Sequence, residues 1–403
     1  IVRATELLLQ ERAPRDVPIM LARAETPSGS AAAGTLTPTV RRVGFEELGT
    51  PITHLMSNGN YSVMLNAAGG GCSSWNDIAL TRWREDSVSD DWGSFFYFRD
   101  PRTEQTWSAG FMPLGRKPDF YQATFSEDKA EISRKDGPFT TSLECLVSPE
   151  DDAEARRVTI TNTTSISKDV ELTSYAELVL APRAADNAHP AFSKMFVETE
   201  YLPELETLLA TRRKRSPSEP EIWTAQFLVW DGLKIGEIEY ETDRARFIGI
   251  GNSRRNPQAI SNGEALSKSV GAVLDPIFAF KLRLRIPAGR QVKCTLWTVA
   301  AASREAVLDL VDRHRQEAAY ERALTLAWTQ AQIQLRHLSI NHEEAHLYQQ
   351  LAGHLIHPDA ALRPSSRYLQ DNMGPQSSLW PHGISGDKSI LLIRIDDIEH
   401  IDL

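Results

Sequence analysis

The segment at residues 278–286 reads Phe-Ala-Phe-Lys-Leu-Arg-Leu-Arg-Ile, so every second side chain is large and apolar. This alternation predicts a β-strand with one buried face and one wet face. Pro287-Ala288-Gly289-Arg290 then predicts a turn, after which the alternation resumes at Val292, Cys294, Leu296 and Thr298. The two segments together indicate antiparallel β-structure rather than a βαβ unit.

The same periodicity extends outward over residues 41–302. Residues 158–162 and 169–173 predict a further pair of strands across a polar loop. Gly69-Gly70-Gly71 lacks the lysine of a phosphate loop and predicts a tight turn or a bulge. Gly and Pro recur throughout without βαβ alternation. We therefore expect a mainly β fold, with a large antiparallel β-sandwich over residues 41–302.

The periodicity becomes helical after residue 302, which predicts a helical linker over residues 303–358. Ser303 is a candidate N-cap for the first helix, and a second helix is expected over about 317–338. Asn341 and Glu344 resemble a capping box that opens a third helix, ending near residue 356. We expect a leader and linker over residues 1–40. Residues 359–403 are expected to begin a further domain, with a buried strand at 390–395.

Composition narrows the function classes. The chain has 403 residues, of which 41% are hydrophobic and 24% charged, so disorder and fibrous repeats do not fit. The formal charge of −10 argues against a dedicated binder of nucleic acid or anionic membranes. Cys72, Cys145 and Cys294 are too dispersed for a disulfide framework, which favours a reducing compartment. No signal peptide or apolar run of about 20 residues is visible, so we expect a cytoplasmic location. Both ends look cut, and a fragment of a longer protein is expected.

One motif has two interpretations. Residues 342–346 satisfy H-E-x-x-H, in which two histidines one helical turn apart can bind zinc while the glutamate acts as a base. Here the motif would occupy the first turn of its helix, and Ala352 stands where a third histidine could follow. We favour an acidic helix start with exposed histidines and expect no metal site.

A cluster of aromatic residues gives the candidate binding site. Four of the nine tryptophans lie between Trp75 and Trp107, together with several Phe and Tyr residues. Such residues suit both the core of a sheet and a stacking platform for sugars, and core packing is the simpler interpretation for most of them. The candidate carbohydrate-binding residues are Trp75, Arg82, Asp86, Asp91 and Trp92. We expect Trp75 and Trp92 to lie nearer to solvent than Trp83.

Longer motifs resemble a known family. They are residues 58–65, 74–77, 81–86, 90–94, 173–180, 188–194, 240–244, 328–332 and 380–387. Together they resemble the soluble glucan-processing region of cyclic β-1,2-glucan synthases, over roughly residues 1–395. Lys388-Ser389 departs from the pattern, since an apolar residue and a proline are expected there. That region is in turn similar to the glycoside phosphorylases of family 94.

The resemblance implies a supersandwich of the galactose mutarotase kind, a helical linker, an (α/α)6 catalytic barrel and a small β domain. In this family phosphate attacks a β-glycosidic bond with inversion, and one barrel Asp protonates the leaving oxygen. The corresponding region of the synthases is thought to control glucan chain length. The barrel motif carrying the Asp has no counterpart before Leu403. No catalytic or phosphate-binding residue can therefore be assigned in this chain. The resemblance implies inorganic phosphate as a possible co-substrate of the full-length parent protein only.

We therefore expect a non-catalytic, carbohydrate-binding or structural N-terminal module of a glucan-processing phosphorylase or glycosyltransferase, inactive by itself. Its implied partners are a β-glucan oligosaccharide and the downstream barrel of the same chain. The resemblance is compatible with a parent anchored in the bacterial inner membrane. Two alternatives stay open, namely an independent sugar-binding protein and, more remotely, a zinc hydrolase using His342 and His346.

Overall fold

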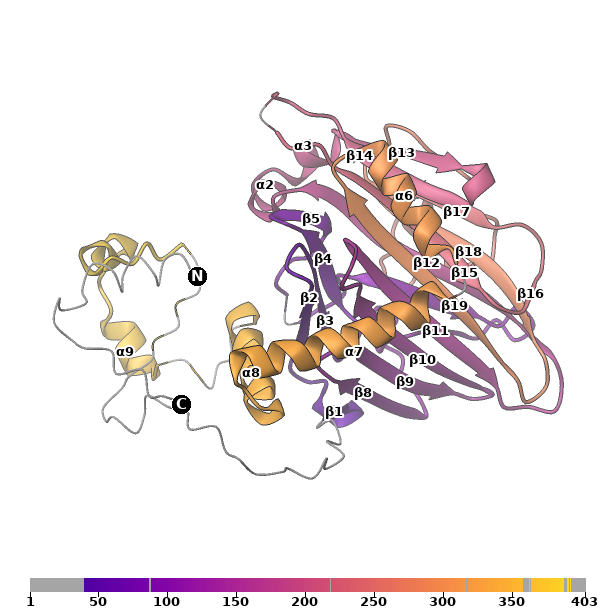
Figure 1. The fold of residues 1–403 in the computed structure, drawn as a ribbon, viewed down its shortest axis with the longest axis horizontal. Helices are drawn as coiled ribbons and strands as arrows, with labels where there is room; N and C mark the ends of the chain where they lie inside the picture. The colour runs from indigo at the N-terminus through magenta and orange to yellow at the C-terminus, as the bar shows by residue number, and fades with distance from the viewer. Residues whose placement is uncertain are drawn as a thin grey trace. The chain divides into compact units, whose positions relative to one another are not determined.

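The computed structural model describes residues 40–357 except 87, 218 and 317, and then residues 362, 364–387, 390 and 392. Two antiparallel sheets stack face to face in this part of the chain (Figure 1). The mainly β, antiparallel architecture predicted from the sequence is confirmed. The expected leader at 1–40 and the strand at 390–395 lie almost wholly outside the described residues.

The first sheet has nine strands. In spatial order they are β1 (Arg41–Gly44), β8 (Phe120–Phe125), β9 (Ala130–Asp136), β10 (Phe139–Val147), β11 (Ala153–Asn162), β19 (Gln291–Ala301), β15 (Trp223–Trp230), β14 (Thr207–Arg212) and β13 (Val197–Leu202).

The second sheet has ten strands. Its main path is β16 (Leu233–Lys234), β18 (Pro276–Ile286), β12 (Lys168–Ala181), β5 (Ile78–Thr81), β4 (Gly71–Trp75), β3 (Tyr61–Asn66) and β2 (Thr53–Ser57). Three strands pair beside this path: β17 (Glu239–Asp243) with β18, β6 (Ser94–Arg99) with β12, and β7 (Thr106–Ser108) with β6.

Aromatic side chains fill the space between the sheets. Trp107 on β7 stacks on Phe98 of the same sheet and on Phe139 of the opposite sheet, with ring centroids 5.4 and 4.9 Å apart. The Trp107 indole donates to the Thr141 hydroxyl at 3.1 Å, which satisfies its buried N–H. Core packing is therefore the role of this part of the aromatic cluster.

The two predicted strand pairs are made of real strands, but their members do not pair with each other. β11 and β12 belong to different sheets, and so do β18 and β19. Both connections cross the core at the same end of the sandwich. There the Asn162 side chain donates to the carbonyls of Ile286 and Pro287, and the Gly289 amide donates to the Thr164 carbonyl. The two crossovers are thus joined by hydrogen bonds. β11 pairs with the preceding strand β10 and with the distant β19, while β12 pairs with the distant β18.

The predicted wet face of residues 278–286 is only partly correct. Arg283 and Arg285 are accessible and pair with Asp169, as the alternation requires. Lys281, in contrast, is 7% exposed, and its ammonium donates to the carbonyls of Gly263 and Glu264. Two short helices, α4 (Arg244–Ile248) and α5 (Gln258–Ser261), contribute apolar residues to a cluster on this outer face, which buries the first half of β18 on both sides.

The helical linker begins as predicted. α6 (Arg304–His314) has Ser303 as its N-cap, and α8 (His342–Ile356) has the predicted Asn341–Glu344 capping box. Between them α7 (Ala319–Leu338) runs along the first sheet with α6, while α8 contacts β2 (Figure 1). No helix among the described residues is long and apolar enough to cross a membrane.

The remaining short elements lie in the connections. They are η1 (Phe45–Glu47), α2 (Arg183–Ala188), α3 (Pro190–Lys194), η2 (Pro203–Leu205), α9 (Ser366–Asp371) and η4 (Gln376–His382).

Candidate functional site

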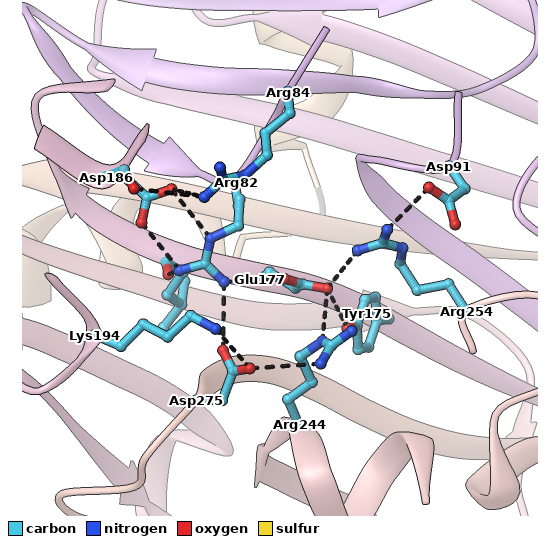
Figure 2. Close-up of polar contacts among 11 residues, drawn as sticks. Arg82, Arg84, Asp91, Tyr175, Glu177, Asp186, Lys194, Arg244, Arg254 and Asp275 are labelled. Carbon is cyan, nitrogen blue, oxygen red and sulfur yellow. Dashed lines mark hydrogen bonds and ion pairs between the residues drawn. The ribbon is translucent and has the colours of Figure 1, made fainter. Parts of the chain in front are cut away.

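A buried carboxylate organises the charged side chains on the outer face of the second sheet. Glu177 on β12 accepts hydrogen bonds from Arg82 at 3.0 Å, Arg244 at 2.9 Å and Arg254 at 2.8 Å (Figure 2). Tyr175, two residues earlier and therefore on the same face of the strand, adds a hydroxyl donor at 2.8 Å. We call these five residues the Glu177 network.

Electrostatics keep Glu177 ionised. Burial by itself raises the pKa of this carboxyl group, since the charged form loses its hydration. The nearby guanidinium groups of Arg244, Arg254 and Arg82 more than offset that effect and lower the pKa to about 2. The network therefore carries a fixed negative centre under all physiological conditions.

Arg82 is held on every side. Its side chain is 2% exposed, and it contacts Asp186 and Asp275, each at 3.3 Å, in addition to Glu177. Its remaining terminal nitrogen donates to the Leu178 carbonyl at 3.2 Å. A guanidinium with all of its nitrogens bonded inside the protein has no donor left for a ligand. Arg82 is therefore a structural member of the Glu177 network.

Arg254 connects the network to the segment where the sequence places the candidate sugar site. It donates to Asp91 at 2.9 Å, and its guanidinium carbon lies 3.8 Å from the centre of the Trp92 ring (Figure 2 shows the Asp91 contact). This distance is typical of a cation–π contact. Asp91, Trp92 and Arg82 thus belong to one assembly.

The other two candidates lie beside this assembly or apart from it. Asp86 accepts from the backbone amides of Val88 and Ser89, which shapes the loop that carries Trp92. Trp75 donates its indole N–H to Asp152 at 2.7 Å, in a contact that involves none of the Glu177 network. Trp75 and Trp92 are partly exposed and Trp83 is buried, so the expected order of exposure is confirmed.

The same loop contains a carboxyl group that titrates near neutrality. Asp90 is 9% exposed and accepts from the Asn66 side-chain amide at 2.7 Å. Burial raises its pKa to about 7, and the hydrogen bond from Asn66 only partly opposes this rise. In the folded protein Asp90 therefore holds its proton between pH 3.8 and about 7, whereas the unfolded chain releases it.

Asp90→Asn should increase stability at pH 8 and leave it nearly unchanged at pH 4. The wild type loses stability as the pH rises through this window, because the unfolded chain releases the Asp90 proton while the folded state keeps it, and losing it there leaves a charge in a buried site. Urea unfolding at the two pH values measures the difference. Asp86→Asn is the control in the same loop: backbone amides, that of Ser89 first, lower the Asp86 pKa, so its replacement should destabilise at pH 8. Destabilisation by Asp90→Asn at pH 8 would contradict this assignment.

The H-E-x-x-H motif contacts a carboxylate of the sandwich. His342 Nδ1 lies 2.7 Å and His346 Nε2 3.7 Å from Glu127 Oε1, on the β8–β9 turn. The histidine side chains are 16% and 17% exposed, so the expectation of freely exposed rings is wrong, because α8 folds back onto the sandwich. Within the part of the chain that the structure describes, no group of three or more His, Cys, Asp or Glu residues is arranged to hold a metal ion.

Comparison with known proteins identifies the class. The architecture is that of a large antiparallel sandwich of two sheets. The chain belongs to the glycosyl hydrolase 94 supersandwich family, whose sequence profile matches residues 38–317.

The similar proteins are much longer than this chain. The cyclic beta-(1,2)-glucan synthase NdvB of Rhizobium meliloti (strain 1021) is 41% identical over 398 residues, which are 98% of this chain and 14% of that protein. Solabiose phosphorylase of Paenibacillus borealis is 24% identical over 216 residues, or 53% of this chain and 26% of that protein. The structure of a bacterial glucoamylase complexed with acarbose aligns with a TM-score of 0.44 and 8% identity. The alignment covers 79% of this chain and 44% of the glucoamylase chain.

Proposed function

We propose that this chain is a non-catalytic, carbohydrate-recognising and structural module of a larger glucan-processing enzyme. The observation that carries the proposal is the 41% identity to a cyclic beta-(1,2)-glucan synthase along almost the whole chain, combined with the supersandwich profile. The parent enzyme would act on β-1,2-linked glucan. Any phosphate would bind in the catalytic domain of that parent. We also propose a cytoplasmic location, because the three buried cysteines are free thiols, as is usual in a reducing compartment.

The proposed recognition surface centres on Trp92. Arg254 covers the ring at 3.8 Å, while the side chain keeps partial exposure. Asp91 and Asp86 add acceptors for sugar hydroxyls on the same loop. An acidic protein cannot attract a neutral glucan by charge, so stacking and hydrogen bonds must provide the affinity. We expect a dissociation constant of about 1 mM, corresponding to roughly 4 kcal/mol.

Trp92→Ala should weaken binding of β-1,2-gluco-oligosaccharides at least tenfold, because it removes the stacking face. The measurement is an NMR or fluorescence titration up to tens of millimolar sugar. Trp328→Ala on α7 is the matched control, since that tryptophan is 53% exposed and has no part in the Glu177 network. Equal affinity of wild type and Trp92→Ala would remove Trp92 from the recognition surface.

The isolated chain should show no phosphorolysis. Incubation with β-1,2-glucan or cellobiose plus inorganic phosphate is expected to give no glucose 1-phosphate above a protein-free blank. The reason is that no catalytic acid can be assigned on this chain by resemblance. Steady turnover that scales with protein concentration would overturn the proposal of a non-catalytic module.

We further propose that α7 and α8 carry the downstream domain of the parent chain. Large apolar side chains on these helices are exposed, namely Trp328, Ile333, Leu338, Leu347 and Tyr348. Exposed large apolar side chains on two adjoining helices favour a surface that another domain covers. α7 contacts β10 and α8 contacts β2, so both helices are attached to the sandwich. A downstream domain that packs on them would therefore be held in a fixed position relative to the sandwich.

A further inference from the structure

A second polar site lies between the helical linker and the sandwich. Helices α7 and α8 and the edge of the sandwich at β2 line a cavity of about 210 Å³ that is open to solvent on one side. The cavity shares no lining residue with the Glu177 network. An engineered protein cavity of about 150 Å³ already holds a benzene ring, so this space is sufficient for one substituted six-membered ring.

Two imidazole rings lie in the cavity wall, that of His54 buried and that of His346 half-buried. His54 on β2 is 3% exposed; the Ser126 backbone lies near its ring, but neither ring nitrogen makes a well-formed hydrogen bond among the described residues. Its ring stacks on Phe125, with centroids 5.0 Å apart, which fixes its orientation. His346 Nε2 is also shielded from solvent, and Glu127 Oε1 lies 3.7 Å from it, beyond hydrogen-bond distance. Buried polar groups are normally hydrogen-bonded, so a partner is to be expected inside the cavity.

The protonation state of His54 defines what it can offer. Burial, reinforced by the positive charge of Arg41, lowers its pKa to about 3, so the ring is neutral at physiological pH. A neutral imidazole presents one donor and one acceptor. Hydroxyl groups, each of which can donate or accept, match either ring nitrogen.

The charge of the lining selects against anions. Glu127 and Asp128 face the cavity, and the lining contains no Lys or Arg. A phosphate or carboxylate would therefore meet two carboxylates without a permanent cation to balance them. His342 already pairs with Glu127 at 2.7 Å, which reduces the demand for a cationic ligand. Ala327, Ala331 and Leu335 of α7 supply an apolar wall beside these polar groups.

We infer that this cavity is a binding site for a single neutral sugar ring, held by His54 and the Glu127 side of the sandwich against the apolar face of α7. The choice of a glucosyl unit as the ligand rests on the proposed function. The presence of the cavity and of its imidazole nitrogens is independent of that proposal. A ring bound here would contact β2, α7 and α8 together and would strengthen the attachment of the linker to the sandwich.

Variants of two cavity-wall residues test the site. His54→Phe preserves a planar ring against Phe125 and removes both ring nitrogens, neither of which makes a well-formed hydrogen bond in the described part of the chain. We expect an unchanged or higher melting temperature and at least a tenfold loss of affinity for methyl β-D-glucopyranoside in this cavity. Gln330→Leu, in the cavity wall, should weaken binding, whereas Gln332→Leu, on the same helix but outside the wall, should not.

The readout must separate this cavity from the Trp92 surface. In protein labelled at histidine and tryptophan, the ring signals of His54 and His346 report on the cavity, and the Trp92 indole signal reports on the other surface. Titration with the glucoside should shift the histidine signals, and glucose 1-phosphate should not. Shifts confined to Trp92, or equal histidine shifts with glucose 1-phosphate, would overturn the inference and leave the proposed function standing. Absence of any shift would overturn both.

Discussion

Glu177→Gln is expected to lower the free energy of unfolding by about 3–5 kcal/mol at pH 7, the usual cost of removing one member of a buried ion pair. The loss is large because Arg82, Arg244 and Arg254 all direct donors at this carboxylate. The neutral amide would leave three guanidinium groups around one site without their shared buried counter-charge, although Asp186, Asp275 and Asp91 still pair with them from the other side. Urea or guanidinium unfolding followed by circular dichroism measures the change.

The effect should depend on pH with a definite sign. The folded pKa of Glu177, about 2, is below its ordinary value of 4.5, so its stabilisation is complete above pH 4.5 and is lost as the pH falls toward 2. The difference between wild type and Glu177→Gln should therefore shrink on acidification. Glu237→Gln is the control, because Glu237 is 87% exposed and pairs with Lys268 on the surface. Its cost should be at most about 1 kcal/mol. Equal losses in the two variants would show that the Glu177 network does not stabilise the fold.

Local features of this fold could be predicted from the sequence because a few neighbouring residues determine them. The Ser303 and Asn341 caps are examples, since each side chain satisfies a backbone amide three residues further on. The alternation of residues 278–286 likewise predicts the strand and its inner face. Local backbone conformation depends on short-range steric contacts and hydrogen bonds, and these can be predicted from the residue types in a short segment.

The partners of each element could not be predicted in the same way. β11 and β12 follow each other in sequence but enter different sheets, because their partners come from strands such as β19 and β18 near the end of the domain. The wet face expected for Lys281 is buried for a related reason, since helices elsewhere in the chain cover it. Nothing in the local pattern of a strand specifies what will later cover it.

The candidate site shows the same division. Asp91, Trp92 and Arg82 stand out in the sequence within a dense stretch of aromatic and charged residues. Glu177 and Arg254, which connect them in the fold, do not stand out in this way. Glu177 does lie within residues 173–180, one of the family motifs, and that was an available signal. Arg254 lies 163 residues from Asp91, and no spacing rule relates positions so far apart. Only the folded sheet brings them together.

Gly71→Ala should be among the most damaging single methyl additions in the sandwich. A Cβ at this position would lie 2.0 Å from the Met64 carbonyl oxygen and 3.1 Å from the Leu65 Cα, both in the paired strand β3. The backbone φ of +154° is also one that side-chain-bearing residues rarely adopt. Overpacking and backbone strain together predict a loss of about 2–6 kcal/mol in the free energy of unfolding. Chemical denaturation of the purified variant measures this loss.

Gly59→Ala separates the two causes. Gly59, at the turn between β2 and β3, has a φ of +104°, but a Cβ there would meet nothing within 4 Å. This variant therefore carries the backbone penalty alone, about 1–3 kcal/mol. The sequence of three glycines predicted a tight turn, and the turn exists, but the pattern could not show which glycine is sterically required. If Gly59→Ala and Gly71→Ala lose equal stability, the contact with Met64 is not what demands glycine at position 71. If Gly71→Ala loses clearly more, close packing of β4 against β3 is the reason.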